Sequence, residues 1–375
     1  MTICGVDRLD EYKGVLKDAR IGVLTAPTGV NKKFKPTYEV LAEDYKVTAL
    51  FAPEHGIRGD AQAGAHISTY VDDETGLTVY SLYGENKYPS EEMLSNIDVM
   101  VFDMQDVGAR YYTYLYALSH TMIACARDGK ELFVLDRPNP INGLTVEGTI
   151  LDEQYPSSVG EYAIPVRYGL TIGEFALYIN KVKNIGCKLT VVPCENWKRS
   201  MWFDQTGLPW ILPSPNMPNP VNASLNYIAT CYFEGTNISE GRGTTMPFEL
   251  VGAPFLNGKA LEEELNAHKL DGVHFRRTYF TPTFEKHAGT RCEGVQLHIT
   301  DRKAYRPFEA GMYLYQAIKK QSGDNMKLLN NGMHLVHLFG DKTILDDDFN
   351  VAKCVKLADK TSKKFKKEAK EFWIY

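Results

Sequence analysis

Residues 98–140 read DVMVFDMQDVGARYYTYLYALSHTMIACARDGKELFVLDRPNP. An apolar run at 99–102 ends in polar residues, a stretch with helical spacing follows as far as Gly129, and a second apolar run covers 132–135. Near-continuous apolar strands joined by a helix are typical of a parallel sheet that is covered on both faces. The segment therefore predicts a β-α-β unit within an α/β domain.

The same alternation continues toward the N-terminus. Segments 20–29 and 47–56 have the composition of further strands, and helical spacing at 36–45 separates them. Each expected strand ends in polar residues, which are Thr25, Glu54, His55, Asp103, Asp106, Asp136 and Arg137. The ligand crevice of an open α/β sheet lies outside the carboxyl ends of its strands, so we expect these residues to converge on one rim. The predicted fold is α/β and Rossmann-like, with a mostly parallel sheet.

The composition changes after residue 246. Segments 272–284 and 294–302 alternate in polarity as strands do, and 307–320 has the spacing of an amphipathic helix. We therefore predict two domains, a Rossmann-like α/β domain over residues 1–246 and a smaller α+β domain over residues 247–375.

Charge and composition exclude several classes of partner. The net charge of −5 argues against nucleic acid, because phosphate binding needs a basic face. No apolar run approaches the roughly 20 residues of a membrane span. No G-x-G-x-x-G motif follows the first strand, so we expect no cofactor. Residues 1–14 are no signal peptide, which leaves two locations open: periplasmic or secreted if a leader was removed, and cytoplasmic otherwise.

Glu54 is the leading catalytic candidate. It follows a buried strand and Pro53, and it precedes His55, Gly56 and Arg58 within a turn that contains glycine. A partly desolvated carboxyl group holds its proton closer to neutral pH, which suits a general acid. The alternative is structural, with Glu54 capping the turn or pairing with Arg58.

Three further groups carry candidate residues. Asp103 and Asp106 end a strand before Arg110 and the tyrosines that include Tyr112, and ordinary helix capping is the alternative for one aspartate. Asp136 and Arg137 end the next strand, where an internal ion pair is the alternative. In the loop SEGRGTT, residues 239–245, two glycines flank Arg242, and backbone N–H groups with hydroxyls suit an anion.

A metal site is an open alternative for the same rim. His55, His66, Asp103 and Asp106 have suitable ligand types, but no spacing among them requires a metal, and we predict none. A metal-dependent hydrolase that uses this Asp/His rim stays a competing hypothesis.

Six segments in order resemble the exo-β-N-acetylmuramidase family (NamZ-type), and the similarity runs from Gly5 to Tyr375. They are FAPEHGIRGDAQAG (51–64), FDMQDVGARYYTY (102–114), LDRPNPING (135–143), PVRYGLTIGEFA (165–176), PSPNMPNP (213–220) and EGTNISEGRGTTMPFELVGAP (234–254). The resemblance implies a bacterial glycoside hydrolase that removes terminal β-linked N-acetylmuramic acid (MurNAc) from the non-reducing end of peptidoglycan fragments during cell-wall recycling. It also implies an active-site cleft between the two domains.

The resemblance implies Glu54 as the catalytic acid. Glycosidases usually need a second carboxyl group, unless the N-acetyl group of the substrate attacks and that carboxylate only orients it. For this partner we rank Glu240 first, then Asp106 and Asp103. The lactyl carboxylate of MurNAc requires an arginine, for which Arg58, Arg110, Arg137 and Arg242 are candidates. The predicted substrate-binding residues are His55, Arg58, Arg110, Tyr112, Asp136, Arg137, Arg242 and Thr244.

The expected partner is a peptidoglycan-derived glycan of alternating MurNAc and N-acetylglucosamine (GlcNAc). A non-catalytic protein that binds peptidoglycan fragments would keep the arginines and tyrosines, and it is the main alternative to an enzyme. Whether the reaction retains or inverts the anomeric configuration depends on the separation of two carboxyl groups, which a sequence does not reveal.

Overall fold

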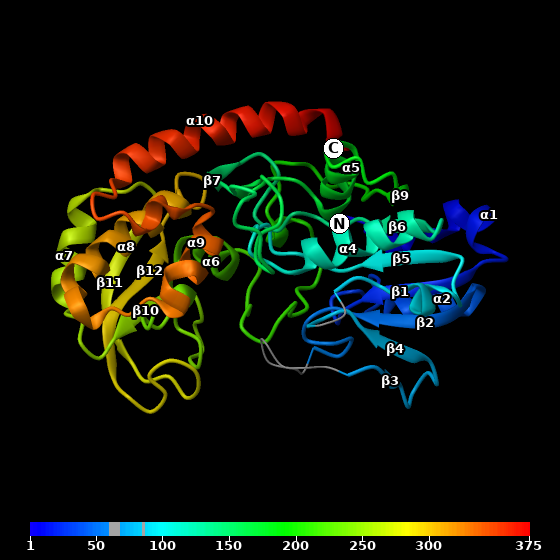
Figure 1. Ribbon diagram of the computed structural model, residues 1–375, viewed down its shortest axis with the longest axis horizontal. Helices are drawn as coiled ribbons and strands as arrows, with labels where there is room; N and C mark the ends of the chain where they lie inside the picture. The colour runs from blue at the N-terminus through cyan, green and yellow to red at the C-terminus, as the bar shows by residue number, and fades with distance from the viewer. Residues whose placement is uncertain (60–67, 85–86) are drawn as a thin grey trace.

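A seven-stranded sheet forms the larger domain of the computed structural model, which describes residues 1–59, 68–84 and 87–375 (Figure 1). Its strand order is β3-β4-β2-β1-β5-β6-β9, and all neighbouring pairs are parallel except β3 with β4. The strands are β1 (Arg20–Thr25), β2 (Lys46–Ala52), β3 (Tyr70–Val71), β4 (Thr78–Ser81), β5 (Val99–Asp103), β6 (Glu131–Leu135) and β9 (Lys188–Val192). The predicted α/β fold with a mostly parallel sheet is confirmed.

Side chains alternate between two cores, one on each face of this sheet. On β5, Met100 and Phe102 belong to the core that includes the helices α4 and α5, whereas Val99 and Val101 belong to the core that includes α2 and the N-terminal segment. Both sets are apolar because both faces are covered, which explains why the strands read as continuous apolar runs. The helices are α1 (Lys13–Leu16), α2 (Thr37–Asp44), α3 (Glu91–Leu94), α4 (Tyr114–Arg127) and α5 (Ile172–Val182).

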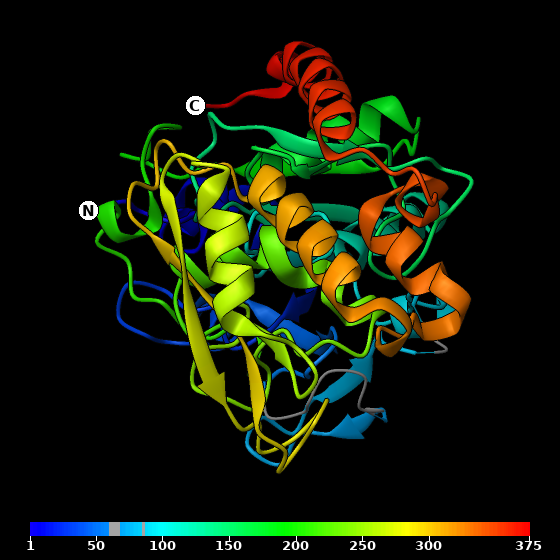
Figure 2. The same ribbon diagram turned by 90° about the vertical axis from the view of Figure 1, so that its left-hand side faces the viewer.

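The smaller domain is built around a three-stranded antiparallel sheet of order β10-β12-β11. Figure 2 shows α7 and α8 beside each other on its outer side, where they pack together. Its elements are α6 (Asn222–Thr230), the 3-10 helix η3 (Cys231–Gly235), β10 (Leu250–Ala253), α7 (Gly258–Ala267), β11 (Val273–Phe280), β12 (Cys292–Ile299), α8 (Pro307–Ser322) and α9 (Met333–Phe339). The boundary at residue 246 stays a prediction.

The helix α10 (Val351–Ala369) connects the two domains. It leaves the smaller domain and crosses above the molecule to the larger one (Figure 1), where it packs on β7 (Glu147–Ile150), the partner of β8 (Pro165–Arg167). The Ser362 hydroxyl donates to the Gly148 carbonyl at 3.0 Å. Among the described residues, no helix combines the length and apolar composition needed to cross a membrane.

Candidate active site

A cavity of about 140 Å³ lies where the carboxyl end of β2 and the start of α4 meet the smaller domain. Residues from distant parts of the chain share its wall. They are Glu54, His55, Tyr111, Tyr112, Thr113, Val159, Ser214, Asn216, Met217, Tyr227, Glu234, Arg242 and Phe248. Two carboxyl groups, one guanidinium and several aromatic rings therefore surround one space.

The turn after β2 places Glu54 at this cavity. His55 and Gly56 both adopt left-handed backbone conformations, with φ of 74° and 78°, and the Gly56 N–H donates to the Pro53 carbonyl at 3.1 Å. Glycine takes such φ values freely, whereas histidine does so at an energetic cost that is often found at functional sites. The glycine in this turn thus allows the chain to reverse directly beside the acid.

Two hydroxyl groups contact the Glu54 carboxyl group. Thr113, at the start of α4, donates its Oγ1 hydrogen to Glu54 Oε2 at 3.1 Å. Burial, together with the charge and hydrogen bonding of Glu54, raises the pKa of Tyr83 to about 12. The Tyr83 phenol is therefore protonated at neutral pH, and its hydrogen serves the bond to Glu54.

Arg242 lies between two glutamates on the opposite side of the cavity. Its Nη2 is 2.8 Å from Glu234 Oε1, and its Nη1 is 3.4 Å from Glu240 Oε1. Lys286 Nζ contacts the other Glu240 oxygen at 2.7 Å. Burial alone would raise the pKa of Glu240, but Lys286 and Arg242 outweigh it and hold this pKa below its usual value. Of the two glutamates, Glu234 lines the cavity and Glu240 does not.

Thr244 shapes the loop that carries Arg242. Its hydroxyl donates to the Gly241 carbonyl at 2.6 Å and accepts from the Met246 N–H at 3.1 Å. These bonds close the turn after Arg242, while Gly241 and Gly243 have φ of 86° and 79°. In this structure Thr244 therefore contributes to the position of the loop, and its side chain is not among those that line the cavity.

Asp103 and Arg137 meet in a different place, at the carboxyl ends of β5 and β6. Arg137 donates from Nε and Nη2 to the two carboxylate oxygens of Asp103 at 2.5 and 2.7 Å, and Thr37 donates a further hydrogen bond. Both side chains are almost fully buried. Arg137 also lines a pocket of about 20 Å³ with Thr28, Gln105 and others. Arg137 therefore forms an internal ion pair, but its partner is Asp103 on the neighbouring strand and not Asp136, the partner that the structural alternative expected.

Asp106 and Arg110 are also bonded within the protein. Asp106 accepts hydrogen bonds from the Gly108 N–H and the Tyr168 hydroxyl, and burial raises its pKa to about 6. The Arg110 guanidinium is fully buried and donates to four backbone carbonyls, of Thr149, Ile164, Leu338 and Phe339. Its donors therefore connect the larger domain to α9.

Asp136, directly after β6, accepts four hydrogen bonds. The donors are the N–H groups of Arg137 and Gly173 and the hydroxyls of Thr171 and Tyr375, at 2.7 to 3.0 Å. The side chain is fully buried, and this burial raises its pKa to about 7 despite the hydrogen bonds.

This raised pKa predicts a pH-dependent stability. Between the unfolded pKa of about 3.9 and the folded value of about 7, only the folded state binds the proton on Asp136. Its contribution to stability is therefore present below about pH 4 and is lost as the pH rises to about 7, by up to about 1.4 kcal/mol per pH unit. Urea unfolding of the wild type and Asp136→Asn from pH 4 to 8 should show the variant gaining relative stability as the pH rises. A difference that does not change with pH would contradict the assignment.

Arg58 lies on the surface beside two acidic residues. Its side chain is 42% exposed and contacts Asp72 at 2.7 Å and Glu74 at 3.0 Å. It is not among the residues that line the cavity at Glu54.

The structure thus brings together Glu54, His55, Tyr112 and Arg242 among the predicted site residues. It places elsewhere Asp103, Asp106, Asp136, Arg58, Arg110, Arg137, Glu240 and Thr244. Sequence reasoning missed Glu234, Tyr227 and Phe248. Glu234 opens one of the six motif segments, and this position was the available signal.

Within the described part of the chain, no group of three or more His, Cys, Asp or Glu side chains is arranged to hold a metal ion. His66, one of the four residues considered for such a site, lies outside the described residues.

Carboxyl groups that face one cavity among tyrosine rings are typical of glycoside hydrolases, and the fold and cavity define an α/β enzyme of this class. Residues 21–221 match the N-terminal model of exo-beta-N-acetylmuramidase NamZ, and residues 225–375 match the C-terminal model. The chain belongs to the exo-β-N-acetylmuramidase NamZ family. The family and enzyme class predicted from the six motifs are thereby confirmed.

Relatives of known sequence and structure agree. Peptidoglycan beta-N-acetylmuramidase NamZ of Bacillus subtilis (strain 168) is 48% identical over 377 residues, which cover 99% of this chain and 91% of the relative. Two crystal structures of DUF1343 family proteins from Bacteroides fragilis NCTC 9343 are 34% and 30% identical to the chain. Each comparison covers 100% of this chain and 99% of the other, with TM-scores of 0.92 and 0.81.

Proposed function

We propose that this chain hydrolyses the terminal β-linked MurNAc from the non-reducing end of MurNAc-GlcNAc glycans derived from peptidoglycan. The family and the peptidoglycan-acting relative support this substrate. The observation that carries the proposal is the cavity in which Glu54 of the larger domain faces the same space as Glu234 and Arg242.

Glu54 acts as the general acid. It stands at the edge of the cavity, in contact with Thr113, and its proton passes to the glycosidic oxygen as the bond to the anomeric carbon breaks. Water supplies the hydroxyl group of the released MurNAc, and the proton of that water restores the acid. The two hydroxyl groups beside Glu54 hold its carboxyl group in position for this transfer.

Glu234 is the second carboxylate. Its Oε1 lies 2.8 Å from Arg242 Nη2, in the wall of the same cavity as Glu54, where a carboxylate can face the positive charge that develops at the anomeric centre. Glu234 attacks the anomeric carbon, activates water, or orients the acetamido group of the substrate. Glu240, the first choice from sequence, instead neutralises Lys286 and holds the other side of Arg242.

Arg242 and the aromatic residues provide the selectivity for MurNAc. Tyr227 and Phe248 form an edge-to-face pair at 4.6 Å in the wall of the cavity, and such rings offer flat apolar faces to a sugar. The buried Nε–H of Arg242 has no hydrogen-bond partner among the described residues. Arg242 also lines the cavity, so its guanidinium is the group that meets the lactyl carboxylate that distinguishes MurNAc from GlcNAc.

Selectivity is tested with two arginine variants. Arg242→Lys keeps the charge between the glutamates but loses the planar fork, so we expect its MurNAc preference in kcat/KM to fall by roughly tenfold or more. Arg58→Ala is the matched control and should keep the preference, because Arg58 contacts Asp72 and Glu74 outside the cavity. The measurement is hydrolysis of 4-nitrophenyl β-MurNAc beside its GlcNAc counterpart. Loss of preference in Arg58→Ala alone would move the selectivity to Arg58.

The same assay separates the enzyme from its alternatives. The proposal expects the wild type to hydrolyse the MurNAc glycoside and not the GlcNAc glycoside. Binding of MurNAc-GlcNAc with no turnover would replace the proposal with a peptidoglycan-binding protein. Turnover that EDTA abolishes and an added divalent cation restores would replace it with a metal-dependent hydrolase.

A further inference from the structure

Three cavities follow one another along the larger domain. Glu54 and Thr113 line the active-site cavity and also a second cavity of about 40 Å³. Glu161 lines this second cavity and also a third, open one of about 730 Å³. Shared wall residues mean that neighbouring cavities adjoin, and together the three cavities form a path along the larger domain, from Glu54 to the open third cavity.

One face of α4 forms a wall of the whole path. The wall residues that α4 and its N-cap contribute are Thr113, Tyr116, Ala117, His120, Ile123, Ala126 and Arg127. All of them except Ala126 lie on one side of the helix, because they follow Thr113 by 3, 4, 7, 10 and 14 residues. The fifteen residues from Thr113 to Arg127 span about 20 Å at a rise of about 1.5 Å per residue, which is longer than a single sugar ring.

The direction of the path fits the leaving group of the reaction. Glu54 protonates the oxygen between the released MurNAc and the rest of the glycan, so these two parts lie on opposite sides of its carboxyl group. The active-site cavity lies between the domains, and Glu234 and Arg242 line it from the smaller domain. β5 points toward the smaller domain in Figure 1, so α4, which follows it, leads away from these two residues.

We propose that the second and third cavities bind the glycan that continues beyond the cleaved bond, so that this enzyme prefers chains longer than a disaccharide. This inference rests on the proposed function. The second cavity takes the first GlcNAc, and the open third cavity takes the following sugars.

The second cavity offers hydrogen-bonding groups beside an aromatic ring. His120 Nε2 lies 2.8 Å from Glu161 Oε2, and both residues line this cavity together with Tyr83. Donors and acceptors next to a flat ring match the hydroxyl groups and the apolar face of a sugar.

The third cavity has the same mixture of groups over a larger area. Lys183 pairs with Glu153 and lies 5.8 Å from the centre of the Tyr162 ring. Ile123 on α4 is 38% exposed, and Arg127, at the end of the same helix, also lines this cavity. Opposite charges that are already paired give hydrogen-bonding groups with little net charge, which suits hydroxyl and acetamido groups better than a strongly charged ligand.

The test measures binding and turnover as a function of chain length. Calorimetry on Glu54→Gln should show that the tetrasaccharide (MurNAc-GlcNAc)₂ binds roughly tenfold more tightly than MurNAc-GlcNAc. In this background, Lys183→Ala and Ile123→Glu should each remove most of the difference and leave disaccharide binding unchanged. Lys181→Ala is the matched control for Lys183→Ala, because Lys181 lies in α5 two residues before Lys183 and does not line the cavity. In the otherwise wild-type enzyme, the first two variants should lower kcat/KM for the tetrasaccharide only.

Equal dissociation constants for the two glycans would overturn the inference. It would also be overturned if Lys183→Ala and Ile123→Glu weakened the binding of both glycans to the same extent. These results are distinct from failure of the proposed function, which would appear as absent turnover of 4-nitrophenyl β-MurNAc by the wild type. The calorimetric comparison does not depend on that turnover.

Discussion

Glu54→Gln is expected to lower kcat for MurNAc-GlcNAc by roughly 10²- to 10⁴-fold, the usual contribution of a general acid. Glutamine has nearly the same shape and still accepts the Thr113 hydrogen bond, but it has no proton to give to the leaving oxygen. The sugar alcohol is a poor leaving group and needs that proton. The measurement is kcat for MurNAc-GlcNAc with the wild type and with Glu54→Gln. The thermal unfolding temperatures of the two proteins, measured in parallel, should be nearly the same.

The leaving group distinguishes an acid from the other catalytic roles. Nitrophenol departs readily without protonation, so Glu54→Gln should lose much less activity on 4-nitrophenyl β-MurNAc than on MurNAc-GlcNAc. Glu234→Gln should slow both substrates to a similar degree, because its charge acts at the anomeric centre. If Glu54→Gln slowed both substrates equally, Glu54 would be the second carboxylate and the acid would have to be sought elsewhere.

Arg137→Leu is expected to reduce the free energy of unfolding by about 3–5 kcal/mol. It leaves Asp103, which is fully buried, without the guanidinium that contacts both of its oxygens at 2.5 and 2.7 Å. An uncompensated buried carboxylate costs more than the pair itself contributes. Urea unfolding measures the loss, and the double variant Asp103→Leu/Arg137→Leu should recover much of it because the lone charge is then absent.

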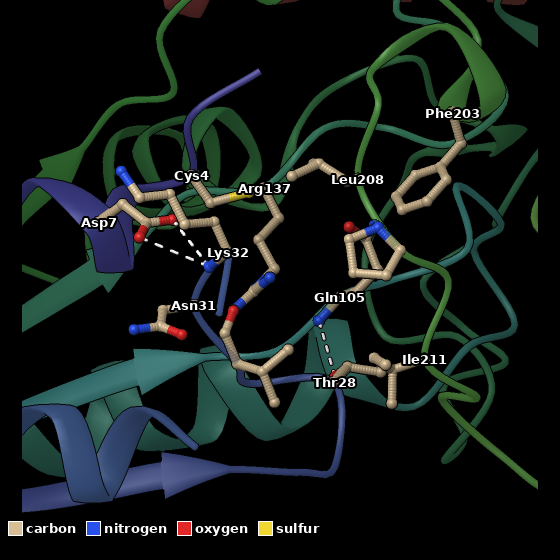
Figure 3. Close-up of a pocket in the computed structure, with 12 residues that line it drawn as sticks. Cys4, Asp7, Thr28, Asn31, Lys32, Gln105, Arg137, Phe203, Leu208 and Ile211 are labelled. Atoms are coloured by element: carbon tan, nitrogen blue, oxygen red, sulfur yellow. Dashed lines mark hydrogen bonds between the residues drawn. The ribbon is translucent and has the colours of Figure 1, made fainter. Parts of the chain in front are cut away.

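The same variants test where the substrate binds. Arg137 was a sequence candidate for the lactyl carboxylate, and the structure places it in the pocket of Figure 3 instead. The folded fraction of Arg137→Leu should therefore keep the KM of the wild type for 4-nitrophenyl β-MurNAc. If Arg137→Leu instead kept the stability of the wild type and had a raised KM, Arg137 would belong to the substrate-binding site.

The strands β1, β2, β5 and β6 could be predicted from their apolar runs, because both faces of the sheet are covered there and no polar alternation obscures them. The strands β3 and β4 at one edge of the sheet were not predicted, because they are short and lack a buried apolar run. The predicted rim was only partly informative. Thr25 on β1 lies opposite Asp103 on β5, and Arg137, just after β6, forms an ion pair with Asp103. The polar residues at these strand ends therefore interact with one another. Only the turn after β2 brings its acid to the cavity. A single sequence does not show which of two charged residues, far apart in the chain, will pair.

Glu234 illustrates a second limit. It reaches the cavity because η3 follows α6 directly and because Arg242 holds its carboxylate. Both conditions are met within the smaller domain, but the cavity itself is completed by Glu54 and Thr113 of the larger domain. Local patterns around Glu234 and Glu240 do not differ in a way that reveals which side chain faces the substrate.

The helix α10 limits how the enzyme admits its substrate. It is tied to the smaller domain by Arg306, which contacts Asp359 at 2.6 Å, and to the larger domain by Lys366, which donates to the Leu144 carbonyl at 2.6 Å. A strap fixed at both ends resists a hinge that would swing the domains apart. Cavity walls that are already in place need little of the substrate's binding energy for assembling the site.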